Sequence, residues 1–130
     1  MKYLLDVNAL IALGFANHQF HHRIVAWLQS VDNPEILTCS ITELGFVRIL
    51  AQAPQYGFTV EEARELLLRL KRNPMLPLRL IADASDISDL PTWAKTPRQV
   101  TDGHLAHLAR ETGAVLATFD RGIPGVLLIP

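Results

Sequence analysis

The chain has 130 residues, of which 49% are hydrophobic and 19% charged, and its formal net charge is −1. This composition argues against a disordered chain and against a protein that holds nucleic acid mainly through a strong basic field. The single cysteine, Cys39, excludes an intrachain disulfide and a cysteine-built metal site. Because no apolar run approaches ~18 residues, we expect no membrane span and no signal peptide. We expect one cytoplasmic domain over residues 1–130.

The first predicted element is a strand that starts near Tyr3 and ends at an acidic residue, Asp6. Its apolar run has no polar face, as is typical of a strand at the centre of a parallel sheet. A carboxylate at the end of such a strand loses hydration unless a cation or hydrogen-bond donor receives it. Ligands of open α/β sheets bind beyond the carboxyl ends of the strands. Asp6 is therefore a site candidate from its position alone.

Helices and strands alternate along the rest of the chain. The predicted helices cover residues 8–15, 18–31, 40–53, 59–72 and 101–112. The predicted later strands cover residues 35–38, 78–82, 115–119 and 126–129, and a helical turn is expected within residues 87–94. Asn8 is the expected N-cap of the first helix, and Thr59 and Glu62 have capping-box spacing. The alternation predicts a three-layer α/β/α domain with a mostly parallel central sheet.

Four carboxylates stand at the ends of predicted elements: Asp6, Glu43, Asp102 and Asp120. Each has a structural explanation when taken singly. Glu43 completes a capping box that starts at Ser40, Asp102 complements the dipole at the start of its helix, and Asp120 suits a turn. Taken together they indicate more, because strand carboxyl ends and helix starts meet at the same end of a parallel sheet.

Four converging carboxylates would repel one another unless cations neutralise them. Oxygen-only ligands favour Mg²⁺ or Mn²⁺, and two such ions would balance the four charges. Two ions roughly 3.5–4 Å apart are a common arrangement for phosphodiester hydrolysis. Asn8 and Thr118 are placed to hydrogen-bond the ligands as outer partners. The sequence thus predicts a metal-dependent phosphoryl-transfer site.

Several segments together resemble the PIN-domain nucleases, and more narrowly the VapC-type toxins of type II toxin–antitoxin pairs. They are Leu-Asp-Val-Asn-Ala-Leu at residues 5–10, the helix that carries Glu43, Arg-Gln-Val-Thr-Asp at residues 98–102, and Leu-Ala-Thr-Phe-Asp at residues 116–120. The resemblance spans nearly the whole chain. It implies a metal-dependent endoribonuclease with Asp6, Glu43, Asp102 and Asp120 as ligands of one or two Mg²⁺ or Mn²⁺ ions.

The resemblance also implies products with 5′-phosphate and 3′-hydroxyl ends, a small antitoxin that blocks the site, and a homodimer. One local difference stands out. Gly103 and His104 follow Asp102, where the family has a small residue and then often tyrosine. This departure concerns nearby substrate contacts, for which Arg98 and His104 are the candidates.

The fourth helix carries a group of basic side chains. These residues, including Arg64 and Lys71, are expected on a solvated face, with contact to phosphates as the alternative.

Two other functions are alternatives to a nuclease. A haloacid-dehalogenase-like phosphatase would need a second aspartate where Asn8 stands. A phospho-receiver signalling module would need paired acids after the first strand and a lysine at a late strand end.

Overall fold

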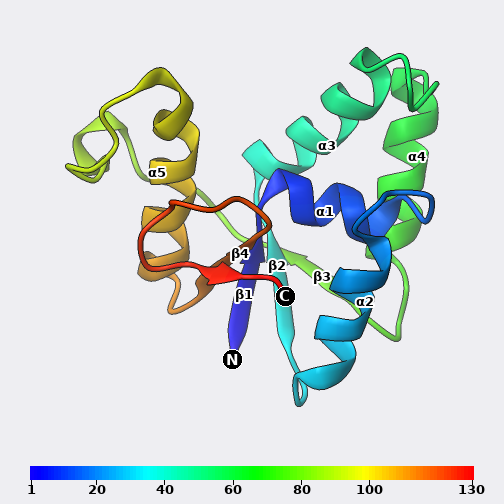
Figure 1. Cartoon of the computed structure of the whole chain (residues 1–130), viewed down its shortest axis with the longest axis horizontal. Coiled ribbons are helices and arrows are strands. Elements are labelled where there is room, and N and C mark those ends of the chain that lie inside the picture. Colours follow the sequence, from blue (N-terminus) through cyan, green and yellow to red (C-terminus); the bar gives the residue numbers. More distant parts are fainter.

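The structure is a computed structural model that describes residues Met1–Pro130, with a five-stranded sheet between helices (Figure 1). The strands are β1 (Lys2–Leu5), β2 (Glu35–Thr38), β3 (Leu78–Leu80), β4 (Val115–Thr118) and β5 (Leu127–Leu128). All pairings are parallel, in the order β3-β2-β1-β4-β5. The helices are α1 (Val7–Gly14), α2 (His21–Ser30), α3 (Ser40–Gln52), α4 (Val60–Lys71) and α5 (Pro97–Glu111), with a 3₁₀ turn η1 (Ile87–Asp89).

Helices cover both faces of the sheet, which confirms the predicted three-layer α/β/α class. Figure 1 shows α5 on one side and α1 to α4 on the other. Successive strand residues point to opposite faces. Accordingly, Tyr3 and Leu5 pack into a cluster with α1 to α4, whereas Leu4 packs with Leu105 and Leu108 of α5. The continuous apolar run of β1 therefore has a direct cause, because its strand is buried on both faces.

The first helix begins one residue earlier than predicted, and its N-cap is Asp6 instead of Asn8. A carboxylate oxygen of Asp6 accepts a hydrogen bond from the Val7 amide at 2.7 Å. The prediction of Asn8 as the cap was wrong because Asn8 lies inside the first turn. Its side chain instead reaches β4, where its amide group donates to the hydroxyl of Thr118 at 3.3 Å.

The late helix begins at Pro97, four residues before the predicted start, so Asp102 lies in its second turn and does not open it. Proline is favoured at the first helical position because its missing N–H has no partner there anyway. Thr96 is the N-cap, and its amide donates to the side chain of Gln99 at 3.2 Å. The predicted stop is confirmed, since Gly113 has a positive φ of 70° just after the helix.

The other predicted elements are present with shifted ends. Helix α2 starts at His21 instead of residue 18, and β3 and β5 are shorter than expected. The capping box of Thr59 and Glu62 is confirmed by reciprocal hydrogen bonds of 2.9 and 3.1 Å. Cys39 is fully buried and unpaired. None of the helices is both long and apolar enough to cross a membrane.

Candidate active site

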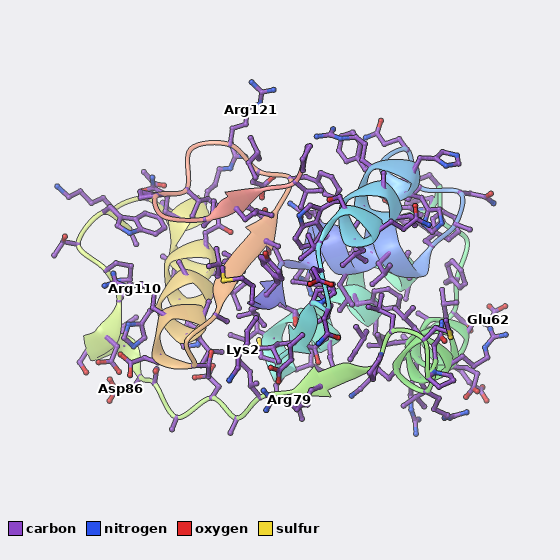
Figure 2. The ribbon with its side chains drawn as sticks, turned by 90° about the horizontal axis from the view of Figure 1, so that it is seen from below. Lys2, Glu62, Arg79, Asp86, Arg110 and Arg121 are labelled. Carbon is purple, nitrogen blue, oxygen red and sulfur yellow. The ribbon has the colours of Figure 1, made fainter.

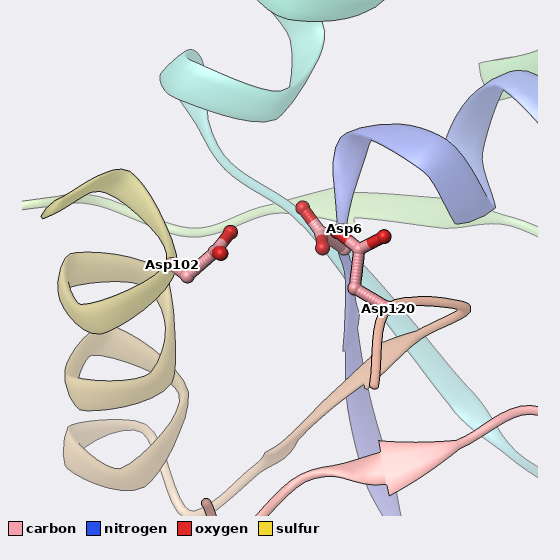
Figure 3. Close-up of side chains that lie close together, drawn as sticks. All are labelled: Asp6, Asp102 and Asp120. Atoms are coloured by element: carbon pink, nitrogen blue, oxygen red, sulfur yellow. The ribbon is translucent and has the colours of Figure 1, made fainter. Parts of the chain in front are cut away.

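Three aspartates from distant parts of the sequence meet beyond the carboxyl end of the sheet. Asp6 follows β1, Asp120 lies two residues after β4, and Asp102 extends from α5 toward both (Figure 3). One carboxylate oxygen from each of the three lies within 4.8 Å of the others. The strand order explains the meeting, because β1 and β4 are neighbours and α5 leads directly into β4.

Asp6 is buried and held by its neighbours. The Thr118 hydroxyl donates to one carboxylate oxygen of Asp6 at 2.7 Å, and the amide of Val7 donates to the other. Thr118 in turn accepts the amide of Asp120 at 3.0 Å. Asn8 accepts the amide of Phe119 at 3.2 Å, which fixes the turn that leads to Asp120. Asn8 and Thr118 therefore orient two of the three aspartates.

The electrostatics of the cluster disfavour three free carboxylates. Burial raises the pKa of Asp6 to about 6, and repulsion from Asp102 and Asp120 adds to the rise, while the hydrogen bonds from Thr118 and Val7 oppose it. Burial first, and then the nearby charge of Asp120, also raises the pKa of Asp102. A bound cation would remove this repulsion.

The donor set fits a hard divalent cation. All three groups are carboxylates that can turn one oxygen toward a common point, and no sulfur or imidazole belongs to the group. Magnesium and manganese take ligands of this kind, often one or two carboxylates completed by water and substrate oxygens. Asp6, Asp102 and Asp120 are therefore the residues that would hold such an ion.

Glu43, the fourth acid expected from the sequence, does not join this group of three. It lies in the first turn of α3, and its carboxylate oxygens contact the ammonium group of Lys71 at 2.8 and 3.0 Å. The hydroxyl of Thr38, at the end of β2, donates to it at 2.5 Å. The expected capping box of Ser40 and Glu43 is wrong by one residue, since Cys39 is the N-cap and its amide donates to the side chain of Thr42 at 3.1 Å.

A hollow of about 510 Å³ adjoins the cluster and contains both charge signs. Asp102 and Asp120 line it together with Arg98, Arg121 and Trp93. Arg98 is close enough to Asp102 to lower the pKa of that carboxyl, against the larger effects that raise it. Figure 2 shows Arg121 extending outward from its loop. The hollow thus holds two guanidinium groups beside the carboxylates of Asp102 and Asp120.

His104, the second candidate for substrate contact, is directed elsewhere. Its ring contacts the carboxylate of Asp83, and it lines a separate hollow with Ile41 and Leu90. The glycine before it has a packing role, because a Cβ at Gly103 would lie 2.9 Å from the Cβ of Ala94. The departure from the family pattern is thus accommodated by contacts within the segment that precedes α5.

Sequence reasoning gave no site role to Thr38 or Arg121, and it did not foresee the partner of Lys71. Lys71 was expected on a solvated face of the fourth helix, with contact to phosphates as the alternative. It instead crosses from the last turn of α4 to Glu43, which is 28 residues away in the sequence. No local sequence pattern predicts an ion pair between residues this far apart. Thr38 had a usable signal, since it ends its strand as Thr118 ends β4.

This chain has a parallel sheet between two layers of helices and gathers three aspartates at the carboxyl end of the sheet. The PIN domain family model matches its residues 3–126. Ribonuclease VapC38 of Mycobacterium tuberculosis is 38% identical over 92% of this chain and 86% of the relative. Ribonuclease VapC29 of the same species is 32% identical over 95% of this chain and 89% of the relative. The chain belongs to the VapC ribonucleases of the PIN-domain family.

Two solved structures share the fold at low sequence identity. VapC20 of Mycobacterium tuberculosis, described as a sarcin-ricin loop cleaving toxin, matches with a TM-score of 0.62 at 10% identity, over 92% of this chain and 89% of that one. VapBC2 from Rickettsia felis, in a crystal structure with a DNA fragment from its own promoter, matches with a TM-score of 0.61 at 19% identity. The match covers 98% of this chain and 96% of that one.

Proposed function

We propose that this protein is the ribonuclease toxin of a toxin–antitoxin pair and that it hydrolyses RNA with Mg²⁺ or Mn²⁺ held by its aspartates. The observation that carries the proposal is the meeting of Asp6, Asp102 and Asp120 within 4.8 Å in a chain of the VapC family. Ions of this kind activate a water molecule for attack on phosphorus and stabilise the charge that develops on the leaving oxygen.

The protein's own residues have distinct roles in this proposal. The three aspartates hold the ion, and Asn8 and Thr118 keep two of them oriented through the hydrogen bonds described above. Arg98 contacts a phosphate of the RNA from the hollow beside Asp102. We assign no substrate contact to His104, because its ring is bonded to Asp83.

The proposed partners are a cognate antitoxin, which blocks the site, and a second copy of this chain. Support for the antitoxin comes from family membership and from the Rickettsia felis VapBC2 structure. A cytoplasmic location suits an RNA substrate and the buried free thiol of Cys39.

The direct test is to map RNA ends after cleavage by the purified chain. We expect discrete fragments with 5′-phosphate and 3′-hydroxyl ends when Mg²⁺ or Mn²⁺ is present, and intact RNA when the metals are removed with EDTA. Cleavage that continues in excess EDTA would contradict the metal-dependent mechanism. An acid-stable aspartyl phosphate, formed from a small phosphodonor, would instead support a phosphatase or a phospho-receiver module.

RNA binding is expected to use few phosphate contacts, because the net charge is −1 and the cations beside the site are local. Arg98→Glu should weaken binding more than Arg64→Glu, since Arg64 is exposed on α4 and does not line the hollow beside the aspartates. Losing one phosphate contact should flatten the salt dependence of the binding constant by about 0.7 in log–log slope for single-stranded RNA.

The comparison is made in the Asp6→Asn background, which should not cleave, with a labelled RNA titrated at several salt concentrations. The Asp6→Asn protein with both arginines intact should show a shallow slope, equivalent to roughly three or four neutralised phosphates. The reverse ranking, with Arg64→Glu the more damaging change, would place the RNA along α4.

A further inference from the structure

Glu43, the fourth acid that the sequence predicted at the site, is paired with a cationic side chain of the chain itself. The ammonium group of Lys71 contacts both of its carboxylate oxygens, at 2.8 and 3.0 Å, and Thr38 donates to one of them. The two side chains are only 24% and 20% exposed, so water screens this pair less than an ordinary surface ion pair. Glu43 thus has both oxygens engaged within the chain itself.

The position of this pair places it at the same end of the sheet as the three aspartates. Leu4 of β1 is paired with Leu37 of β2, so Asp6 and Thr38 leave neighbouring strands at the same end. The arrangement is repeated on the two sides of β1, since Thr118 donates to Asp6 and Thr38 donates to Glu43. The two sides differ in one respect. Lys71 donates to Glu43 on the β2 side, whereas no lysine or arginine donates a hydrogen bond to Asp6 on the β4 side.

We propose that this site takes a single divalent ion, at Asp6, Asp102 and Asp120, because Lys71 holds Glu43 out of the set of metal ligands. The inference rests on the proposed metal-dependent function and deepens it. A second divalent ion at Glu43 would have to displace an ammonium group from two short contacts or lie against it as a like charge. Lys71 is therefore a positioning residue that supplies the positive charge a two-ion site would take from its second metal.

Charge balance agrees with one ion. The three aspartates carry three negative charges when ionised, and one divalent ion leaves a single negative charge among them. Glu43 and Lys71 neutralise each other. Arg98, which lies close enough to Asp102 to affect its pKa, can offset that remaining negative charge. With two divalent ions and Lys71 in place, the same groups would carry one net positive charge, to which Arg98 would add a second.

The test measures how many Mn²⁺ ions bind to metal-stripped protein, by equilibrium dialysis and by electron paramagnetic resonance, which distinguishes an isolated Mn²⁺ from a coupled pair. Wild type should bind one isolated ion. Lys71→Met frees Glu43 and should bind a second ion that couples to the first. Arg72→Met removes a neighbouring charge from an exposed and looser ion pair, and it should behave like wild type.

The double variant Glu43→Gln/Lys71→Met removes the pair without changing the net charge. It should bind one Mn²⁺ with a dissociation constant within about threefold of wild type, well below the roughly 10- to 100-fold loss typical when even an outer partner of a metal ligand is removed. Two coupled ions in wild type, a single ion in Lys71→Met, or a larger affinity loss in the double variant would each overturn the single-ion site. Absence of Mn²⁺ binding by wild type would instead overturn the proposed metal centre, and this inference with it.

Discussion

Replacing Asp6 with asparagine is expected to abolish RNA cleavage while leaving the fold intact. A metal ion held here would lower the barrier to phosphodiester hydrolysis by several kcal/mol, so its loss should reduce the cleavage rate by roughly a thousandfold or more. Asp6 is the most buried of the three aspartates, and Asp102 and Asp120 face it (Figure 3). Water can therefore stabilise the negative charge of Asp6 less than that of Asp102 or Asp120.

The asparagine variant should fold because it preserves the shape and the hydrogen bonds of the site. Its side-chain oxygen can still accept the amide of Val7, as Asp6 does at 2.7 Å. The Thr118 hydroxyl, which donates to Asp6, can rotate to accept from the new amide group. The helix cap and the contact between α1 and β4 are therefore retained.

Asp86→Asn is the matched control, because it makes the same chemical change at an exposed acid outside the cluster (Figure 2). Its asparagine can still accept the amide of Ser88, as Asp86 does at 2.8 Å. Cleavage by this control should equal wild type at matched Mg²⁺. The metal mechanism fails if a folded Asp6→Asn protein, verified by circular dichroism, cleaves RNA at the wild-type rate.

The sequence was sufficient to predict the order of elements and three members of the acidic group. Apolar runs that end directly before Asp6 and Asp120 locate strand ends, although β4 itself ends at Thr118. Parallel strands bring such ends together by geometry alone. Asp102 was placed correctly in space even though the start of its helix was misplaced. The position of Asp102 relative to Asp6 depends on how α5 packs beside β4, and the residue at which the helix begins has little effect on it.

What the sequence could not provide is the partner of Glu43. A capping box and a metal ligand were both reasonable for an acid in the first turn of a helix, and each relies on neighbours that a sequence pattern can locate. The observed partner, Lys71, depends instead on how α3 and α4 pack and on the length of the lysine side chain. Side-chain pairs of this kind are set by tertiary packing, which periodicity does not encode.

The misplaced start of α5 has a similar cause on a smaller scale. Residues before Asp102 include a proline, which disfavours a helix interior but is well suited to the first helical position. The helix predicted over residues 101–112 therefore starts four residues too late, since α5 begins at Pro97. The signal for the true start was available in Thr96 and Gln99, which have the spacing of an N-cap and its capping-box partner. With Thr96 as the N-cap, Pro97 occupies the first helical position, where proline does not break the helix.

The metal-free protein is expected to lose stability as the pH rises from 4 to 7, and Asp6 is the cause. In the folded state burial raises the pKa of Asp6 to about 6, against an ordinary value of 3.8. Between these values the folded protein keeps a proton that the unfolded chain has released, so the free energy of unfolding falls as the pH rises through this window. A rise of this size corresponds to roughly 3 kcal/mol at pH 7.

The measurement is urea unfolding of metal-stripped wild type and Asp6→Asn at pH 4, 5, 6 and 7, because the difference between the two proteins cancels the titration of other groups. The variant should be close to wild type at pH 4 and more stable by up to about 3 kcal/mol at pH 7. At a hundred times its dissociation constant, Mg²⁺ should restore ~2.7 kcal/mol to wild type and nothing to a variant that cannot bind it. A stability difference that stays constant from pH 4 to 7 would show that Asp6 keeps an ordinary pKa. The acidic cluster would then place no strain on the metal-free fold, and the functional and structural demands on Asp6 would not oppose each other.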